Sequence, residues 1–242
     1  MATLAAGVLA MSALAAGAGQ TKGFLLKSIA VGSDTHKYVV YVPEAYNGRT
    51  KWPTIIFLNG YGECGKDGLK QISVGLGPAI MSNSQEWPFI VIFPQKPEFN
   101  ENWERYDDMV MAILQQTRKE YSVDPSRVYL TGLSQGGHGT WAIGAKHPDL
   151  FAAIAPVCGW GDETTAQALR SVPVWAFHGE ADPVVNIEGS RKMVDAVNAA
   201  GGNAKLTSYP GVEHNSWDKA YREEKLGSWF LQHVKGAQGS KG

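Results

Sequence analysis

One serine, flanked by glycines, has the setting in this sequence that most clearly suggests chemistry. Ser134 lies in the segment GLSQG at 132–136, directly after the apolar, β-rich run at 127–131. A residue at a sharp corner between strand and helix is forced toward positive φ, and flanking glycines leave it room. The complete G-x-S-x-G pattern in this context predicts that Ser134 is a nucleophile, with an ordinary Gly/Ser turn as the alternative.

A nucleophilic serine needs a base, because its hydroxyl is a weak nucleophile until a histidine accepts its proton. His214 lies in a loop between an expected strand at 205–209 and the last expected helix, and parallel sheets place their chemistry in such loops. His178, at the end of the expected strand at 173–178, is the weaker alternative because a structural role is commoner there. The remaining histidines are expected to pack or to lie at the surface: His36, His138, His147 and His233.

The base in turn needs a carboxylate that orients it. Asp182 follows the expected strand at 173–178 and precedes Pro183, which biases the aspartate toward an extended backbone and one side-chain direction. Glu180 is the main competitor and Asp162 the next. A simple Asp-Pro turn is the structural alternative for Asp182.

The resulting chain order of serine, aspartate and histidine is that of the α/β-hydrolases and differs from the chymotrypsin and subtilisin orders. From about residue 24 to 233 the sequence resembles this superfamily. The segment LNGYGECG at 58–65 is similar to the oxyanion loop of phospholipase/carboxylesterase-type and dienelactone-hydrolase-type esterases. That group includes feruloyl-esterase-like, acetylxylan-esterase-like and polyhydroxybutyrate-depolymerase-like enzymes. Further similar segments lie at 151–159, 178–185 and 210–217.

The resemblance implies an oxyanion hole built from two backbone N–H groups. One belongs to Gln135, the residue after the nucleophile, and the other to Tyr61, after the third expected strand. Glycines on both sides of Tyr61 allow the main chain to approach a substrate closely. Asn59 and Cys64 stand where the group usually has histidine and arginine, which leaves open how the loop is supported.

The pattern of apolar runs predicts a single α/β domain over residues 21–236, with about eight mostly parallel strands and helices on both faces. This is the α/β-hydrolase fold that the resemblance implies. Strands are expected near 24–31, 36–43, 53–58, 89–94, 127–132, 152–157, 173–178 and 205–209. Helices are expected near 68–82, 104–121, 135–147, 162–170, 188–200 and 216–233.

A short connection limits how the site is covered. Only about fourteen residues separate the strand that ends near 158 from the next, where hydrolases of this fold often insert a lid, so no separate lid domain is expected. An uncovered site suits soluble esters or esters that project from a polymer. Trp160, Trp103 and Trp217 are the candidates for an acyl-binding or sugar-binding platform, with simple packing as the alternative for each.

Composition excludes several other functions. A net charge of −1 over 242 residues and the absence of Lys/Arg runs give no basis for nucleic-acid binding. No P-loop or dinucleotide-binding glycine pattern occurs, and the two cysteines and six histidines lack metal-ligand spacing. We therefore expect neither a metal nor an organic cofactor, and the partner is an ester substrate.

The first 20 residues are almost entirely small and apolar, and they resemble the apolar region and cleavage site of a signal peptide without its basic start. They predict a secreted or periplasmic protein without a stable membrane span; a truncated signal or an Ala-rich helix are the alternatives. Residues 237–242 are expected to form a flexible tail. In an exported protein Cys64 and Cys158 could pair, with two free thiols as the alternative.

These observations predict a serine carboxylesterase that works through an acyl-enzyme, with Ser134 attacking, His214 transferring the proton and Asp182 orienting the histidine. The alternatives are a serine peptidase of prolyl-oligopeptidase resemblance, a polyester depolymerase, and a hydrolase-fold binding module without turnover. The chain could also be the catalytic part of a longer protein with an N-terminal binding module.

Overall fold

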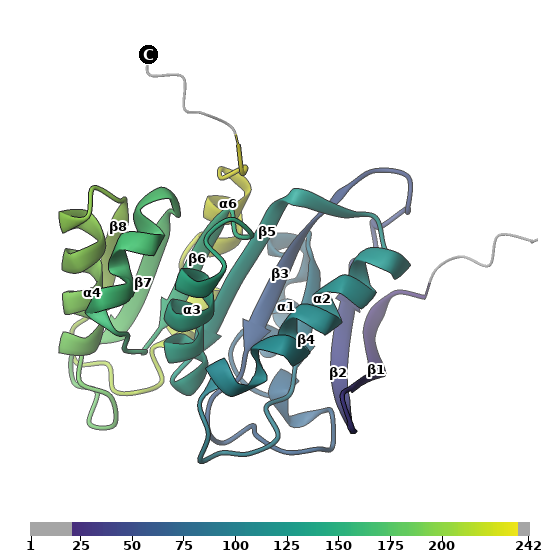
Figure 1. The fold of residues 1–242 in the computed structure, drawn as a ribbon, viewed down its shortest axis with the longest axis horizontal. Coiled ribbons are helices and arrows are strands. Elements are labelled where there is room, and N and C mark those ends of the chain that lie inside the picture. Colours follow the sequence, from purple (N-terminus) through teal and green to yellow (C-terminus); the bar gives the residue numbers. More distant parts are fainter. Residues whose placement is uncertain (1–20, 237–242) are drawn as a thin grey trace, which may run out of the picture.

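The computed structural model, which describes residues 21–236, is organised around one sheet of eight strands (Figure 1). Both terminal segments that we singled out, 1–20 and 237–242, lie outside the described residues, so the signal-like segment and the tail stay predictions. The strands are β1 (Gly23–Val31), β2 (Asp34–Val42), β3 (Trp52–Leu58), β4 (Ile90–Pro94), β5 (Val123–Leu133), β6 (Ala153–Val157), β7 (Val174–Gly179) and β8 (Ala204–Tyr209).

The strand order is β1-β2-β4-β3-β5-β6-β7-β8. β2 pairs antiparallel with β1 and with β4, and every pairing from β4 to β8 is parallel. The central strands are continuous apolar runs, such as IVIFP in β4, because helices cover both faces and leave no side for water. The predicted mostly parallel eight-stranded sheet is confirmed.

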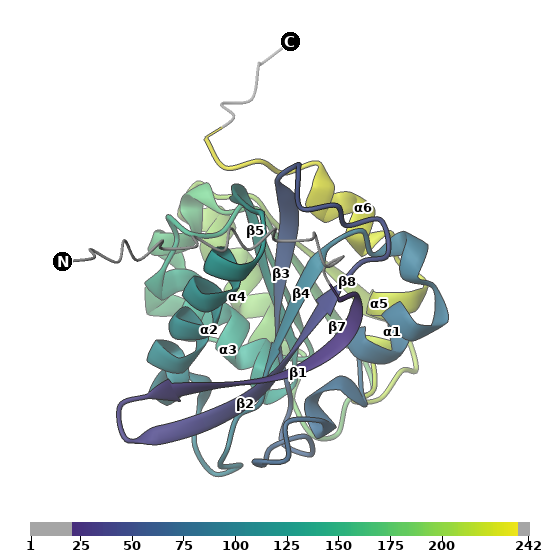
Figure 2. The ribbon, with the colours of Figure 1, turned by 90° about the vertical axis from the view of Figure 1, so that its right-hand side faces the viewer.

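Helices cover the two faces of the sheet in two groups. The α-helices are α1 (Leu76–Ser82), α2 (Asp107–Glu120), α3 (Gln135–Lys146), α4 (Glu188–Ala199), α5 (Trp217–Arg222) and α6 (Leu226–Leu231). α2, α3 and α4 pack on one face and α1, α5 and α6 on the other, as Figure 2 shows, and each group encloses its own apolar core. Among the described residues, no helix combines the length and apolar character that crossing a membrane requires.

Short 3₁₀ helices stand where some longer helices were expected. They are η1 (Lys70–Ile72), η2 (Ser84–Glu86), η3 (Trp103–Tyr106) and η4 (Glu163–Ser171). The expected helix at 68–82 is η1 followed by α1, because Gly75 turns the chain between them at φ 69°. The expected helix at 216–233 is divided into α5 and α6. In α6, a Cβ on Gly227 would lie 2.4 Å from the Glu86 carbonyl oxygen, so this helix packs directly against η2.

The parallel strands bring distant parts of the sequence to one edge of the sheet. β5, β6, β7 and β8 are parallel neighbours, so the loops that follow them lie side by side at their carboxyl ends. Open α/β sheets bind ligands at this edge. Ser134, Asp182 and His214 all lie in these loops.

Candidate active site

Ser134 occupies the corner between β5 and α3 in a backbone conformation that is strained for a residue with a side chain. Its φ is 56° and its ψ is −117°, and its N–H donates to the Val157 carbonyl at 3.0 Å. A Cβ on Gly136 would lie 1.9 Å from the Leu58 carbonyl oxygen, and one on Gly132 would lie 2.5 Å from that of Gly136. Glycine is therefore required at both positions, as the motif predicted.

A continuous chain of hydrogen bonds joins the serine to a histidine and a carboxylate. The Ser134 Oγ lies 2.9 Å from Nε2 of His214, and Nδ1 of the same ring lies 2.7 Å from Oδ2 of Asp182. The carboxylate has no exposed surface, whereas about a fifth of the imidazole surface is open to solvent. The structure thus brings together the three residues that the strand ends predicted, each within hydrogen-bond distance of the next.

Asp182 is held as an oriented carboxylate by its own loop. Its Oδ1 accepts the backbone N–H groups of Val184 at 2.8 Å and Val185 at 2.9 Å. Burial alone would raise the pKa of Asp182, but the bonds from His214 and from these two N–H groups bring it below its ordinary value. The competing carboxylates are engaged elsewhere: Glu180 accepts the Ser208 hydroxyl, and Asp162 accepts the N–H of Thr164.

His178, the alternative base, is a buried structural residue. Its Nδ1 lies 2.8 Å from the Ser190 hydroxyl and its Nε2 lies 2.9 Å from the Val185 carbonyl oxygen, with the Asp182 carboxylate at 3.3 Å. Burial lowers the pKa of His178. Both ring nitrogens face protein groups within the core, so His178 fixes the loop of Asp182 and His214 is the histidine that reaches the serine.

The expected oxyanion loop lies directly against the serine corner. A Cβ on Gly60 would lie 2.8 Å from the Leu133 side chain, which places the loop before Tyr61 beside the residue that precedes Ser134. Gln135 begins α3 on the other side of the serine. The sites of both expected N–H donors are thus close to the nucleophile, and their role remains a prediction.

Asn59 and Cys64, the two unusual residues of this loop, both bond to the same carbonyl. The Asn59 amide donates to the Gly60 oxygen at 2.7 Å, and the Cys64 thiol donates to it at 3.3 Å. The amide oxygen of Asn59 also accepts the N–H of Lys96 at 3.1 Å. These bonds answer how the loop is supported without the usual histidine and arginine. Cys64 and Cys158 are both free thiols, so the disulfide is absent and the alternative is correct.

A buried lysine that we did not predict organises the start of α3. Lys96 has no exposed surface, and its ammonium donates to Oε1 of Gln135 at 2.7 Å and to the carbonyls of Glu98, at 3.1 Å, and Glu101. The Gln135 amide in turn donates to the Phe99 carbonyl at 2.9 Å. Burial lowers the pKa of Lys96. The one available signal was its position directly after the buried strand β4.

The three predicted platform tryptophans have different environments. Trp103 has no exposed surface and its indole N–H donates to the Asn59 carbonyl at 3.0 Å, so it supports the loop from below and cannot contact a substrate. That part of the prediction is wrong. Trp217 is half-buried, and its ring stands edge-on to His214 with centroids 5.3 Å apart. Trp160 is also half-buried, on the loop after β6.

A second histidine–carboxylate pair, also unpredicted, lies one helical turn beyond the serine. Nε2 of His138 lies 2.8 Å from the Glu104 carboxylate, and Nδ1 lies 3.0 Å from the Trp160 carbonyl oxygen. The imidazole stacks on the Trp160 indole with centroids 4.7 Å apart and an interplanar angle of 12°. Burial would lower the pKa of His138, but the bonds to Glu104 and to the carbonyl raise it above its ordinary value.

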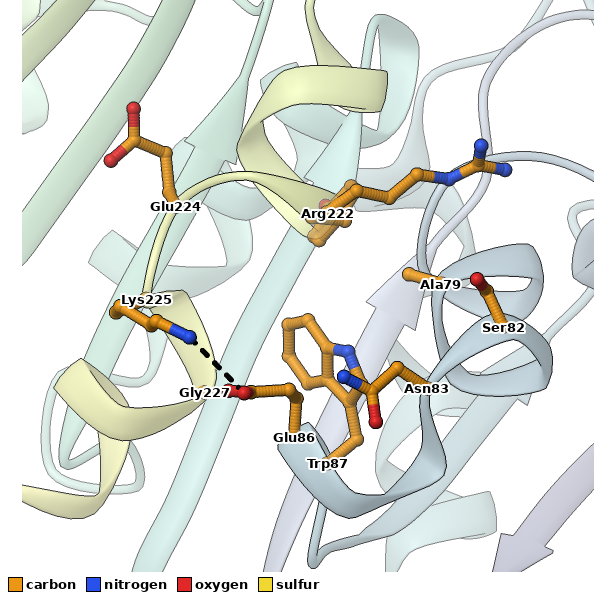
Figure 3. A pocket seen from close by; sticks show the side chains of 10 residues that line it. Ala79, Ser82, Asn83, Glu86, Trp87, Arg222, Glu224, Lys225 and Gly227 are labelled. Carbon is orange, nitrogen blue, oxygen red and sulfur yellow. Dashed lines mark hydrogen bonds and ion pairs between the residues drawn. The ribbon is translucent and has the colours of Figure 1, made fainter.

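The described residues contain no metal-binding cluster, and one small cavity lies away from the site. Among residues 21–236, no group of three or more His, Cys, Asp or Glu side chains is arranged to hold a metal ion. A small cavity of about 130 Å³ between α1, η2 and α5 contains the ion pair of Lys225 and Glu86 at 3.1 Å (Figure 3). None of the predicted site residues lines it.

Comparison with known proteins agrees with the sequence resemblance. The chain is 31% identical over 134 residues to a bifunctional acetylxylan esterase/xylanase of Neocallimastix patriciarum, covering 52% of this chain and 20% of that protein. It is 29% identical over 145 residues to feruloyl esterase B of Neurospora crassa, covering 55% and 47%. The chain thus spans about half or less of the length of these relatives.

Solved structures show the same fold. A thermostable esterase superimposes with a TM-score of 0.80 at 30% identity, covering 88% of this chain and 63% of that one. The feruloyl esterase module from Clostridium thermocellum superimposes with a TM-score of 0.70 at 18% identity, covering 89% and 90%, which shows likeness of fold alone. The predicted α/β-hydrolase fold is therefore confirmed. The model of the dienelactone hydrolase family matches residues 36–225, and this chain accordingly belongs to that family of hydrolases.

Proposed function

We propose that this protein is a serine carboxylesterase that hydrolyses accessible carboxylic esters through an acyl-enzyme. The observation that carries the proposal is the unbroken hydrogen-bonded chain from Ser134 through His214 to Asp182 at a strained corner of the backbone. A binding module without turnover would have no need for a positive φ at the serine, which costs on the order of 1–3 kcal/mol.

In the first half-reaction, Ser134 Oγ attacks the ester carbonyl carbon while Nε2 of His214 accepts its proton. The carbonyl oxygen takes the electron pair, and the tetrahedral intermediate then expels the alcohol, which receives the proton from Nε2. In the second, Nε2 of His214 removes a proton from water, whose oxygen attacks the acyl carbon; the tetrahedral intermediate then releases the acid as the bond to Ser134 Oγ breaks, and Nε2 returns the proton to that oxygen. Asp182 stays ionised throughout and stabilises the imidazolium.

Negative charge on the substrate oxygen requires donors that are already in place. We assign this role to the backbone N–H groups of Gln135 and Tyr61. In other enzymes, removal of one such donor lowers kcat about a hundred- to a thousandfold. The start of α3 adds the positive end of a helix dipole at the same point. The clamp of Lys96 on the Gln135 side chain holds this first turn in position.

The substrates that fit best are short-chain or plant-wall-type esters that can reach an open site. Within the described residues, the connection between β6 and β7 contains only the short helix η4 and no inserted lid domain. Relatives named acetylxylan esterase and feruloyl esterase support this class. A polyester is the second candidate, since the chain is 34% identical over 85 residues to poly(3-hydroxyalkanoate) depolymerase C of Paucimonas lemoignei, covering 29% of this chain and 20% of that protein.

Covalent labelling tests the proposal directly. A fluorophosphonate probe is expected to modify the native protein once, at Ser134, and to abolish cleavage of 4-nitrophenyl acetate. Ser134→Ala is expected to lose both, whereas Ser82→Ala, which removes an exposed serine on α1, retains both. Labelling and full ester cleavage by Ser134→Ala would refute the assignment, and faster cleavage of a peptide amide than of the matched ester would favour a peptidase.

A further inference from the structure

Two exposed aromatic rings stand together beside the proposed nucleophile. Among the described residues, Tyr61 and Phe99 are the aromatic side chains with half or more of their surface exposed, at 57% and 50%. They come from different loops, one after β3 and one after β4, and yet their ring centroids lie 5.0 Å apart. Adjacent exposed apolar surface on loops that carry a site is typical of ligand contact.

The backbone around Phe99 is held so that the ring is presented to solvent. The carbonyls of Glu98 and Glu101 accept hydrogen bonds from the Lys96 ammonium, and the Phe99 carbonyl accepts one from the Gln135 amide. The phenyl ring therefore remains exposed above a loop that is fixed on its inner side. Because the backbone of the loop is already ordered, little loop entropy is lost when a ligand packs on the ring.

A polar groove begins where this loop meets the β1–β2 hairpin, the long hairpin that extends to the lower left of Figure 2. Its volume is about 630 Å³, within the roughly 300–1,000 Å³ range of small-molecule sites. Charged side chains of both signs line it: Asp34, Lys37, Lys66, Glu98, Glu101 and Arg105.

Part of this lining is already ordered. The Glu101 carboxylate accepts the Tyr106 hydroxyl at 2.5 Å and the Arg105 guanidinium at 2.8 Å, and Lys66 pairs with Glu98 at 2.9 Å. The lining therefore contains both carboxylate acceptors and cationic N–H donors, which can bond to the hydroxyls of a ligand.

We propose that the Tyr61–Phe99 ring pair and this groove form a carbohydrate subsite that binds the sugar portion of an ester substrate. A pyranose ring with equatorial hydroxyls has an apolar C–H face, which packs on aromatic rings, and an edge of hydroxyls, which bonds to charged groups. Glu98 and Glu101, which flank Phe99 in the same loop, line the groove, and the carbonyl of Phe99 itself bonds to Gln135, the residue after the proposed nucleophile. This inference deepens the proposed function and rests on it.

An aromatic acyl group is the competing occupant, and the groove decides against it. An aromatic acid would use the two rings alone, whereas a sugar also has hydroxyls that can bond to the polar lining of the groove. In addition, the acyl carbon must stay at Ser134, whereas a sugar chain on the alcohol side can extend from the rings along the hairpin.

Binding to an inactive protein separates this subsite from catalysis. In the Ser134→Ala background, xylotetraose is titrated and followed by calorimetry or NMR, with ferulate as a parallel probe. Phe99→Ala is expected to weaken xylotetraose binding about tenfold, and Phe99→Tyr to retain it. Met81→Ala, which removes a 59% exposed side chain on α1, is the matched control and is expected to bind as before.

Three results would overturn the subsite: xylotetraose does not bind, Phe99→Ala binds it as tightly as the parent, or Phe99→Ala weakens ferulate alone. The last would assign the rings to an aromatic acyl group. Failure of the proposed function has a different signature, because it appears as native protein that neither reacts with fluorophosphonate nor cleaves 4-nitrophenyl acetate, whatever sugar it binds.

Discussion

Two histidine–carboxylate pairs flank the start of α3, and similar bond lengths accompany different environments. His214 lies 2.7 Å from Asp182, and His138 lies 2.8 Å from Glu104. The Asp182 side chain has no exposed surface, whereas 43% of the Glu104 side chain is exposed. A short bond between imidazole and carboxylate therefore does not by itself identify a catalytic pair.

The two histidines differ in the partner of the ring nitrogen that does not face the carboxylate. In the proposed mechanism Nε2 of His214 faces a hydroxyl that can donate to it, so the ring can accept a proton. Both nitrogens of His138 face acceptors, the Glu104 carboxylate and the Trp160 carbonyl, and these favour a ring that carries a proton on each side. The first arrangement suits proton transfer, and the second suits a fixed positive charge stacked on the Trp160 indole.

The largest contrast is expected from removing each carboxylate charge without changing its shape. Asp182→Asn should lower kcat for 4-nitrophenyl acetate on the order of ten-thousandfold, because the amide favours the wrong tautomer of His214. Glu104→Gln should lower it less than about threefold. Equal losses in the two variants would show that the pairs are not functionally distinct.

His178 is expected to contribute to the stability of the fold and not to proton transfer. His178→Ala removes the side-chain partner of the Val185 carbonyl and one of the two partners of the Ser190 hydroxyl, which still donates to the Gly159 carbonyl, and it should lower the free energy of unfolding by roughly 2–4 kcal/mol. Urea denaturation measures this loss, and His138→Ala is the comparison. An unchanged urea midpoint would contradict the structural role of His178.

The smallest expected effect is the pH dependence of the pair formed by His138 and the partly exposed Glu104. The pKa of His138 is raised in the folded protein and that of Glu104 is lowered. Their mutual stabilisation is therefore complete between the ordinary pKa values of Glu and His, and it is lost as pH rises through the raised pKa of His138 or falls through that of Glu104.

Glu104→Gln should accordingly reduce the free energy of unfolding by no more than about 1 kcal/mol at pH 5.5, since Glu104 is partly exposed, and by less at pH 9. Urea denaturation at the two pH values makes the comparison. A larger difference at pH 9 than at pH 5.5 would rule out a charged His138.

Local sequence patterns were sufficient to predict the fold and the three hydrogen-bonded residues of the site. Ser134, Asp182 and His214 each follow a strand of the parallel sheet, and strand ends are visible in apolar runs and turn residues. The sequence positions alone therefore indicated which side chains meet, although their roles remain to be tested.

The missed residues depend on contacts between distant segments. His138 and Glu104 are 34 positions apart and neither stands at a strand end, so no local pattern pairs them. Trp103 was a candidate for the substrate platform, with packing as the alternative, but it is buried and its indole N–H donates to the Asn59 carbonyl. Burial of a loop tryptophan is decided by tertiary packing, which periodicity does not report.

The two halves of the sheet also differ in how freely they could change over evolutionary time. The proposed nucleophile, acid and base all follow β5, β7 and β8, where backbones approach so closely that even one added carbon is excluded at Gly136. The groove is contributed by the β1–β2 hairpin and the chain after β4, whose lining is side chains at the surface. Exchange of the hairpin tip at 31–37 is therefore expected to alter the proposed subsite while it leaves the loops after β5, β7 and β8 unchanged.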